Sequence, residues 1–209
     1  MSEILAHPKG VGLVIFGDNI APPARLAMIR RLQAARVKVL AYASTRQMGT
    51  YDPATFGTRP LLTVEAQIRH AERTYHPDGI FLDNVPSGLS RLAYFRELSR
   101  YVRSLPGRFL VLNGAASASY LPLADVLVEF EGYYRDFIRW RPGAWVHSEP
   151  ASRSAAIVHT VPGARAGGTA RHLARRDNVG YLFVTDRRFP LAYAGLPRLA
   201  AQRCAGAGA

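Results

Sequence analysis

Two carboxylates in this chain directly follow short apolar runs, at positions where chemistry is possible. Asp83 ends the apolar run 80–82 and is followed at once by Asn84 and Pro86. Asp and Asn disfavour strands, and Pro cannot donate to a sheet ladder, so the strand should stop with Asp83 at its C-terminal tip. Glu131 ends a second apolar run in the same way. In α/β folds these tips are where ligands bind and reactions occur.

A pair of carboxylates indicates glycoside hydrolysis, which needs one group as nucleophile or base and another as general acid. The strands that end in Asp83 and Glu131 are two apart in chain order, so the two groups should face each other across one barrel mouth. Phe130 and the pair Tyr133-Tyr134 surround Glu131 with apolar and aromatic groups, a setting that raises the pKa of a carboxyl. The competing interpretation of Asp83 is a helix N-cap, a position that Asp often takes.

Further polar residues follow the other apolar runs and should line a sugar site on the same face. They are Asp18, Tyr42, Asn84, Asn113, His159 and Asp186. Polar residues after strands also serve as turn formers, so each one alone says little. Glu129 shares the strand parity of Glu131 and is expected to pair with an arginine lower in the barrel. His159 has no second histidine at ligand spacing, so we expect a hydrogen-bonded core histidine and no metal site.

Apolar runs alternate with helical patterns along the chain, which predicts a parallel sheet covered by helices. Strands are expected over 11–16, 37–43, 80–82, 109–112, 124–131, 155–159 and 179–184, and helices over 23–35, 63–75, 89–105, 134–140 and 169–175. A complete (β/α)₈ barrel needs eight strands and about 250 residues. We therefore predict one α/β domain over 1–209, an incomplete (β/α)-barrel of the TIM type without its first strand, with 1–10 and 198–209 irregular. An open doubly wound sheet is the competing architecture, but no G-x-G-x-x-G fingerprint follows the first strand.

The net charge of +12 is unusual for such a domain. Only Lys9 and Lys38 are lysines, and the arginines are spread along the chain without an aromatic-interleaved basic stripe. A solvated basic surface is therefore favoured over nucleic-acid binding, and polyanion binding through Arg171, Arg175 and Arg176 is a weaker alternative. No run is long and apolar enough to span a bilayer, and the start lacks a signal peptide. The chain as written would therefore be cytoplasmic, but its compartment stays open.

The strand-end motifs resemble the spherulin-4-like family, which is related to (β/α)-barrel glycoside hydrolases that cut galactosamine-containing polysaccharides. The matching pieces are 39–45, 57–60, 79–83, 111–114, 124–131 and 181–186. The resemblance implies an endo-acting hydrolase of α-linked galactosamine or N-acetylgalactosamine polymers, with no cofactor. It also implies that Asp83 and Glu131 are the essential acidic pair.

Two departures from the family keep a second interpretation open. Spherulin-4-like proteins usually have Asp-Glu at the strand tip, where this chain has Asp83 and Asn84, a pair similar to the Asp-Asn-Val of the neighbouring polygalactosaminidase family. The family's first strand and export signal have no counterpart before Val11, which would leave open barrel edges. The N-terminal residues, the C-terminal tail or a second subunit in a homo-oligomer would have to cover them. The alternative function is therefore a catalytically impaired carbohydrate-binding or interaction protein.

Overall fold

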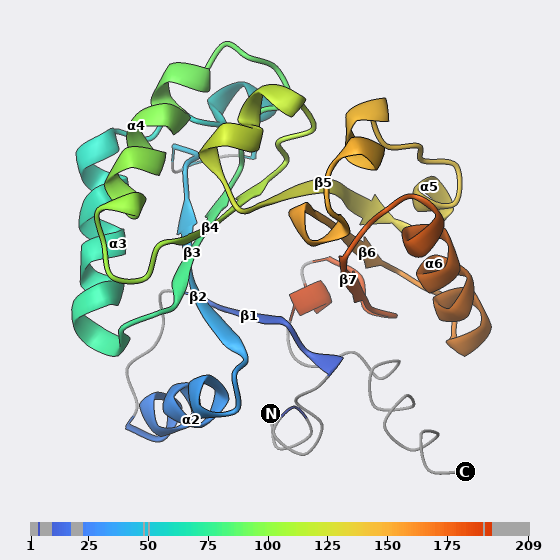
Figure 1. The fold of residues 1–209 in the computed structure, drawn as a ribbon, viewed down its shortest axis with the longest axis horizontal. Coiled ribbons are helices and arrows are strands. Elements are labelled where there is room, and N and C mark those ends of the chain that lie inside the picture. The colour runs from blue at the N-terminus through green and yellow to red at the C-terminus, as the bar shows by residue number, and fades with distance from the viewer. Residues whose placement is uncertain are drawn as a thin grey trace. The chain divides into compact units, whose positions relative to one another are not determined.

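The computed structural model describes residues 4, 10–17, 23–47, 49, 51–189 and 191–193. Strands and helices alternate along them (Figure 1). The strands are β1 (Leu13–Phe16), β2 (Lys38–Ser44), β3 (Gly79–Asp83), β4 (Phe109–Asn113), β5 (Val126–Tyr133), β6 (Ser154–His159) and β7 (Tyr181–Val184). The α-helices are α2 (Pro23–Ala34), α3 (Leu61–Tyr75), α4 (Leu92–Arg103), α5 (Tyr134–Phe137) and α6 (Ala164–Arg176).

The strands join in the order in which they occur in the chain, from β1 to β7 in one sheet. The pairs β1–β2, β2–β3, β3–β4 and β6–β7 are parallel, and the β2–β3 register places Ser44 beside Asp83. A doubly wound sheet would reverse its strand order at a switch point, whereas sequential order is that of a (β/α)-barrel. The prediction of a TIM-like α/β fold with seven strands is confirmed.

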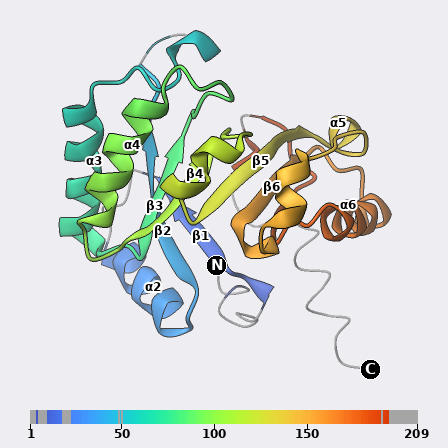
Figure 2. The same cartoon turned by 45° about the horizontal axis from the view of Figure 1, so that its top comes forward.

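Contacts divide the chain into two compact units, 8–127 and 128–209 together with 1–7. In the first unit, helices α3 and α4 lie side by side against the sheet (Figures 1 and 2). Helix α4 buries Phe95, Leu98 and Val102, a spacing of three and four residues that places them on one face. Because β3 and β4 are covered in this way, their apolar runs are buried almost throughout.

Two aspartates that directly precede β3 and β5 each bond to the strand that comes before in the sheet. The backbone N–H of Asp78 donates to Val39 O, and the Asp78 Oδ2 accepts from the Val39 N–H, both at 2.8 Å. Asp125 repeats this arrangement with Leu110, at 2.8 Å and 2.7 Å. Each carboxylate therefore takes the place of a backbone acceptor and fixes the register before the strand begins.

The second unit has its own core between its helices and strands. Phe137, Val158, Ala170 and Val179 belong to one buried cluster. Trp140 packs on this cluster and stacks on Phe137 with ring centroids 5.7 Å apart. Trp140 is thus a packing residue of this unit.

Several local expectations differ from the structure. Helix α3 begins at Leu61 after Pro60, two residues earlier than expected. Helix α6 begins at Ala164, five residues earlier than expected, and the long loop 45–60 contains a short 3₁₀ helix at Pro53–Thr55. Asp18 and almost all of 1–10 and 198–209 lie outside the described residues, and the single-domain organisation stays a prediction. Among the helices described, none is both long and apolar enough to cross a membrane.

Candidate functional site

The Asp83 carboxylate is held by three side-chain donors at the carboxyl end of β3. Tyr42 Oη and Asn84 Nδ2 donate to its Oδ2 at 2.7 Å and 2.8 Å, and Asn113 Nδ2 donates to its Oδ1 at 2.8 Å. A carboxylate has about four acceptor positions, so the remaining one lies on Oδ1. The donors come from β2, β4 and the residue after β3, which is the convergence of strand ends that the sequence predicted. The arrangement orients an anionic oxygen and leaves part of it open.

The backbone around Asp83 is unusual and firmly bonded. Asn84 has φ 63°, the left-handed region, which Asn tolerates better than most residues. Thr45 is fully buried, and its Oγ1 lies 2.8 Å from Asp83 O and 2.9 Å from Asn84 O. The N–H of Val85 donates to Asn113 O at 2.9 Å. These bonds fix the turn that directs Asn84 back to the carboxylate.

The helix-cap interpretation of Asp83 is wrong. Helix α4 begins at Leu92, and its cap residue is Arg91. Every bond to the Asp83 carboxyl group comes from a side chain, and no backbone N–H of a described residue donates to it. Asp83 therefore has no local structural role of the kind that N-cap statistics favour.

A supporting set of residues behind Tyr42 was not singled out from the sequence as part of the site. Arg59 donates to Ser44 O at 3.1 Å and also bonds Gln67, whose Nε2 donates to Tyr42 O at 3.3 Å. Ser44 Oγ accepts from Asn84 Nδ2 at 3.1 Å. Arg59 and Ser44 carried a signal, because they lie in the 57–60 and 39–45 pieces of the family resemblance. These contacts hold the end of β2 in place.

In the second unit, Glu131 is exposed near the end of β5 and accepts a hydrogen bond from Tyr193 Oη. The expectation of an apolar enclosure around Glu131 is therefore wrong. Tyr193 belongs to an exposed aromatic group that also contains Phe189, with ring centroids 5.5 Å apart. Sugar rings bind to such exposed aromatic faces, so Glu131 lies beside a surface suited to carbohydrate.

His159 lies at the end of β6, buried between two rings. Its ring centroid is 4.5 Å from that of Tyr133 and 5.0 Å from that of Phe189, and its Nδ1 lies 3.2 Å from Thr160 Oγ1. Burial lowers the pKa of His159, and the nearby Asp136 carboxylate opposes that shift. His159 is thus a mainly neutral ring that packs between aromatic groups at neutral pH.

Glu129 is the carboxyl group that the structure encloses. It is 8% exposed, and its Oε1 has no hydrogen-bond partner. Burial raises its pKa to about 8. The expectation of an arginine partner is wrong, because none of the described arginines pairs with it. Glu129 is therefore protonated at neutral pH and has no ion-pair partner among the described residues.

Asp186 lies after β7, partly buried, with its Oδ1 unbonded among the described residues. The described residues contain no group of three or more His, Cys, Asp or Glu side chains that could hold a metal ion. Asp83 and its donors in the first unit, and Glu131 with its aromatic neighbours in the second, are thus the parts of the molecule best suited to chemistry.

The family model of spherulation-specific family 4 matches residues 22–205. This chain belongs to that family. The matched residues include the Asp83 cluster, Glu131 and Tyr193. Among curated protein sequences, none matches the chain.

Solved structures with a similar fold include Sph3, a chitinase and an endo-β-N-acetylglucosaminidase. Aspergillus clavatus Sph3 in complex with GalNAc is 22% identical with a TM-score of 0.73, over 96% of this chain and 87% of that one. The chitinase ChiC from Aspergillus fumigatus is 15% identical with a TM-score of 0.59, over 98% and 92%. A fungal endo-β-N-acetylglucosaminidase of glycosyl hydrolase family 18 is 19% identical with a TM-score of 0.56, over 91% and 86%. These likenesses show the TIM-like α/β fold.

Proposed function

We propose that this protein is an endo-acting glycoside hydrolase of α-linked galactosamine or N-acetylgalactosamine polysaccharides. The observation that carries the proposal is the triple hydrogen bonding of Asp83 by Tyr42, Asn84 and Asn113. The three donors hold the carboxylate within a narrow orientation, as a catalytic carboxylate requires.

Asp83 is assigned as nucleophile or electrostatic stabiliser. Its open acceptor position on Oδ1 is where an anomeric carbon or the positive charge of an oxocarbenium-like transition state would be met. Asn84, Tyr42 and Asn113 hold the carboxylate and border the sugar. Replacing any one of them should therefore lower kcat more than it changes KM.

Glu131 is assigned as the general acid and base. It is exposed, so a substrate can reach it, and Tyr193 restrains its rotamer by hydrogen bonding. Glu129, two residues earlier, is protonated but enclosed, and it does not offer its proton to solvent. The proposed substrate class is supported by the GalNAc in the Sph3 complex.

The proposal is tested by incubating the protein with galactosaminogalactan and following both reducing ends and product length. Endo-cleavage predicts a rapid fall in chain length with a slow release of monosaccharide. An Asp83→Asn variant should lose the activity, and a Glu97→Gln variant, which changes an exposed carboxylate on α4, should keep it. Unchanged polymer length in the wild-type reaction would reject the hydrolase assignment.

A second candidate function is carbohydrate binding without turnover. Asn84 favours it, because the family usually has glutamate at this place and an amide cannot exchange a proton. The same incubation separates the two functions: retention of the protein on the polymer with no new reducing ends supports the binding protein.

A further inference from the structure

A hollow of about 550 Å³ lies on the first unit beside α4. No residue of the Asp83 cluster lines it. Three arginines of α4 line it, Arg96, Arg100 and Arg103, together with Pro122 and Leu123 of the 3₁₀ helix η3 (Ala118–Leu123). The arginines are spaced by four and three residues, so they project from one helix face over about 10 Å. The hollow therefore has a cationic side and an aliphatic side.

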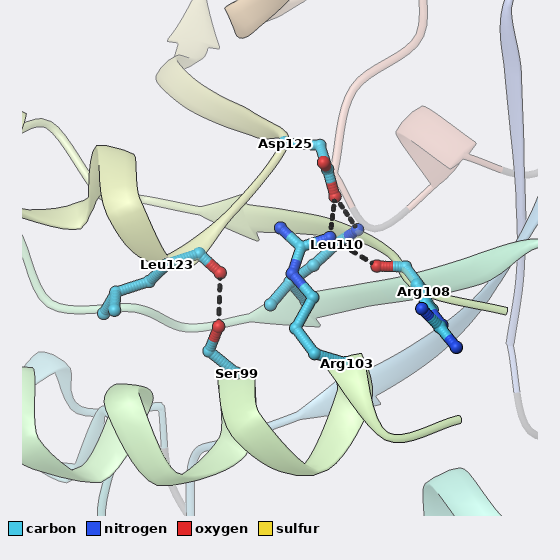
Figure 3. A network of polar contacts seen from close by, with 6 residues as sticks. All are labelled: Ser99, Arg103, Arg108, Leu110, Leu123 and Asp125. Atoms are coloured by element: carbon cyan, nitrogen blue, oxygen red, sulfur yellow. Dashed lines mark hydrogen bonds and ion pairs between the residues drawn. The ribbon is translucent and has the colours of Figure 1, made fainter. Parts of the chain in front are cut away.

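Arg103 is fixed in position by the protein (Figure 3). Its Nη1 donates to Arg108 O at 2.6 Å and to Asp125 Oδ2 at 2.7 Å. A guanidinium has five N–H donors, so the three on Nε and Nη2 are left for a ligand. Because the side chain is already ordered, an anion that binds it loses less entropy than at a mobile arginine.

The local charge stays positive after the nearby carboxylates are counted. Asp125 faces Arg103, and Glu97 pairs with Arg100 at the exposed surface, where such a pair contributes little. Arg96 is exposed and bonds none of the described residues. All three guanidinium groups therefore have N–H donors to spare, and Arg96 has no competing carboxylate among the described residues.

The aliphatic side narrows the choice of ligand. Ser99 is buried, and its hydroxyl donates to Leu123 O at 2.6 Å. Because that hydroxyl is already bonded, Pro122 and Leu123 form an apolar wall. None of the described residues along the hollow is aromatic, whereas sites for single-stranded nucleic acid stack bases on aromatic rings. The C–H face of a sugar ring packs on such a wall, while its acidic group meets the arginines.

We propose that this hollow binds an acidic polysaccharide, one that bears carboxylates along its sugar chain, at a site separate from the Asp83 cluster. Hydrolysis of a galactosamine polymer does not explain the net charge of +12. The proposal gives part of that charge a function. The proposal places the anion site on α4, whereas the sequence pointed to arginines of α6. On α6, Arg176 is engaged by Asp177 through two bonds, of 2.8 Å and 2.6 Å.

The test measures binding of a fluorescently labelled decamer of galacturonic acid to the full chain by anisotropy at low salt. The double variant Arg96→Ala/Arg100→Ala should weaken binding about tenfold, because two exposed charge-assisted contacts are removed. The control is Arg165→Ala/Arg175→Ala, which removes the same charge from exposed positions of α6 and should change binding less than about twofold.

Three results would overturn the proposal: no binding by the wild type, equal losses in both double variants, or equal affinity for an uncharged glucose decamer. Tighter binding of a thymidine decamer, lost in the α4 variant, would assign the hollow to nucleic acid instead. An Asp83→Asn variant should bind the galacturonate decamer as the wild type does, so this result is independent of whether the protein hydrolyses galactosamine polymers.

Discussion

Replacing Glu129 by Gln should make the stability of the protein less dependent on pH. Burial raises the pKa of Glu129 from 4.5 to about 8 in the folded protein. Between these values the unfolded chain releases the proton and the folded protein keeps it, so the free energy of unfolding falls as pH rises. At about 1.4 kcal/mol per pH unit, the wild type loses about 3 kcal/mol by pH 7 and about 5 kcal/mol above pH 8. Gln carries no such proton, so this loss should be absent in the variant.

The assay is urea unfolding at several pH values from 5 to 8.5, with the difference in unfolding free energy plotted against pH. The slope matters and the offset does not, because Gln also leaves a polar group in the core. Glu97→Gln is the control, since it replaces an exposed carboxylate of α4 and should keep the wild-type slope. Parallel curves for wild type and Glu129→Gln would refute the burial argument.

Three further changes have direct structural consequences. Asp125→Ala leaves the Leu110 N–H and the Arg103 guanidinium without their shared acceptor, and should lower the unfolding free energy by about 2–4 kcal/mol in urea titrations; an unchanged midpoint would contradict the register role. Gly114→Ala places a Cβ 2.4 Å from Val85 O at φ 101°, and should lower the melting temperature measured by circular dichroism by several degrees, about 4 °C or more. Tyr193→Phe removes the donor to Glu131 and should lower kcat about tenfold on a galactosamine polymer, with no effect in a Glu131→Gln background; equal effects in both backgrounds would show that Tyr193 acts elsewhere.

The polar strand tips were predictable because apolar runs end abruptly before them. Asp83 and Asn113 each follow such a run, and parallel pairing in chain order brings their ends together. Tyr42 is different, because it lies within β2 and reaches Asp83 from the neighbouring strand. All three were predicted at one end of the sheet, because each lies at the carboxyl end of an apolar run and such ends converge in a barrel.

Burial depth and distant contacts could not be predicted in the same way. Glu129 and Glu131 share strand parity, yet one is enclosed and the other exposed, because depth depends on what packs over the strand. Tyr193 contacts Glu131 across 62 residues of chain, and no local pattern marks that contact. The left-handed backbone of Asn84 depends on a hydrogen bond from Thr45, 39 residues earlier in the chain. The residues next to Asn84 in the sequence do not predict that bond.

The central claim is that Asp83 and Glu131 together carry hydrolysis of a galactosamine-containing polymer. The most direct test compares initial rates of reducing-end formation for wild type, Asp83→Asn, Glu131→Gln and the double variant, each shown to be folded by circular dichroism. Groups that act as a unit predict losses of about 10³-fold in each single variant and little further loss in the double variant. Rates within tenfold of the wild type in both single variants would contradict the claim.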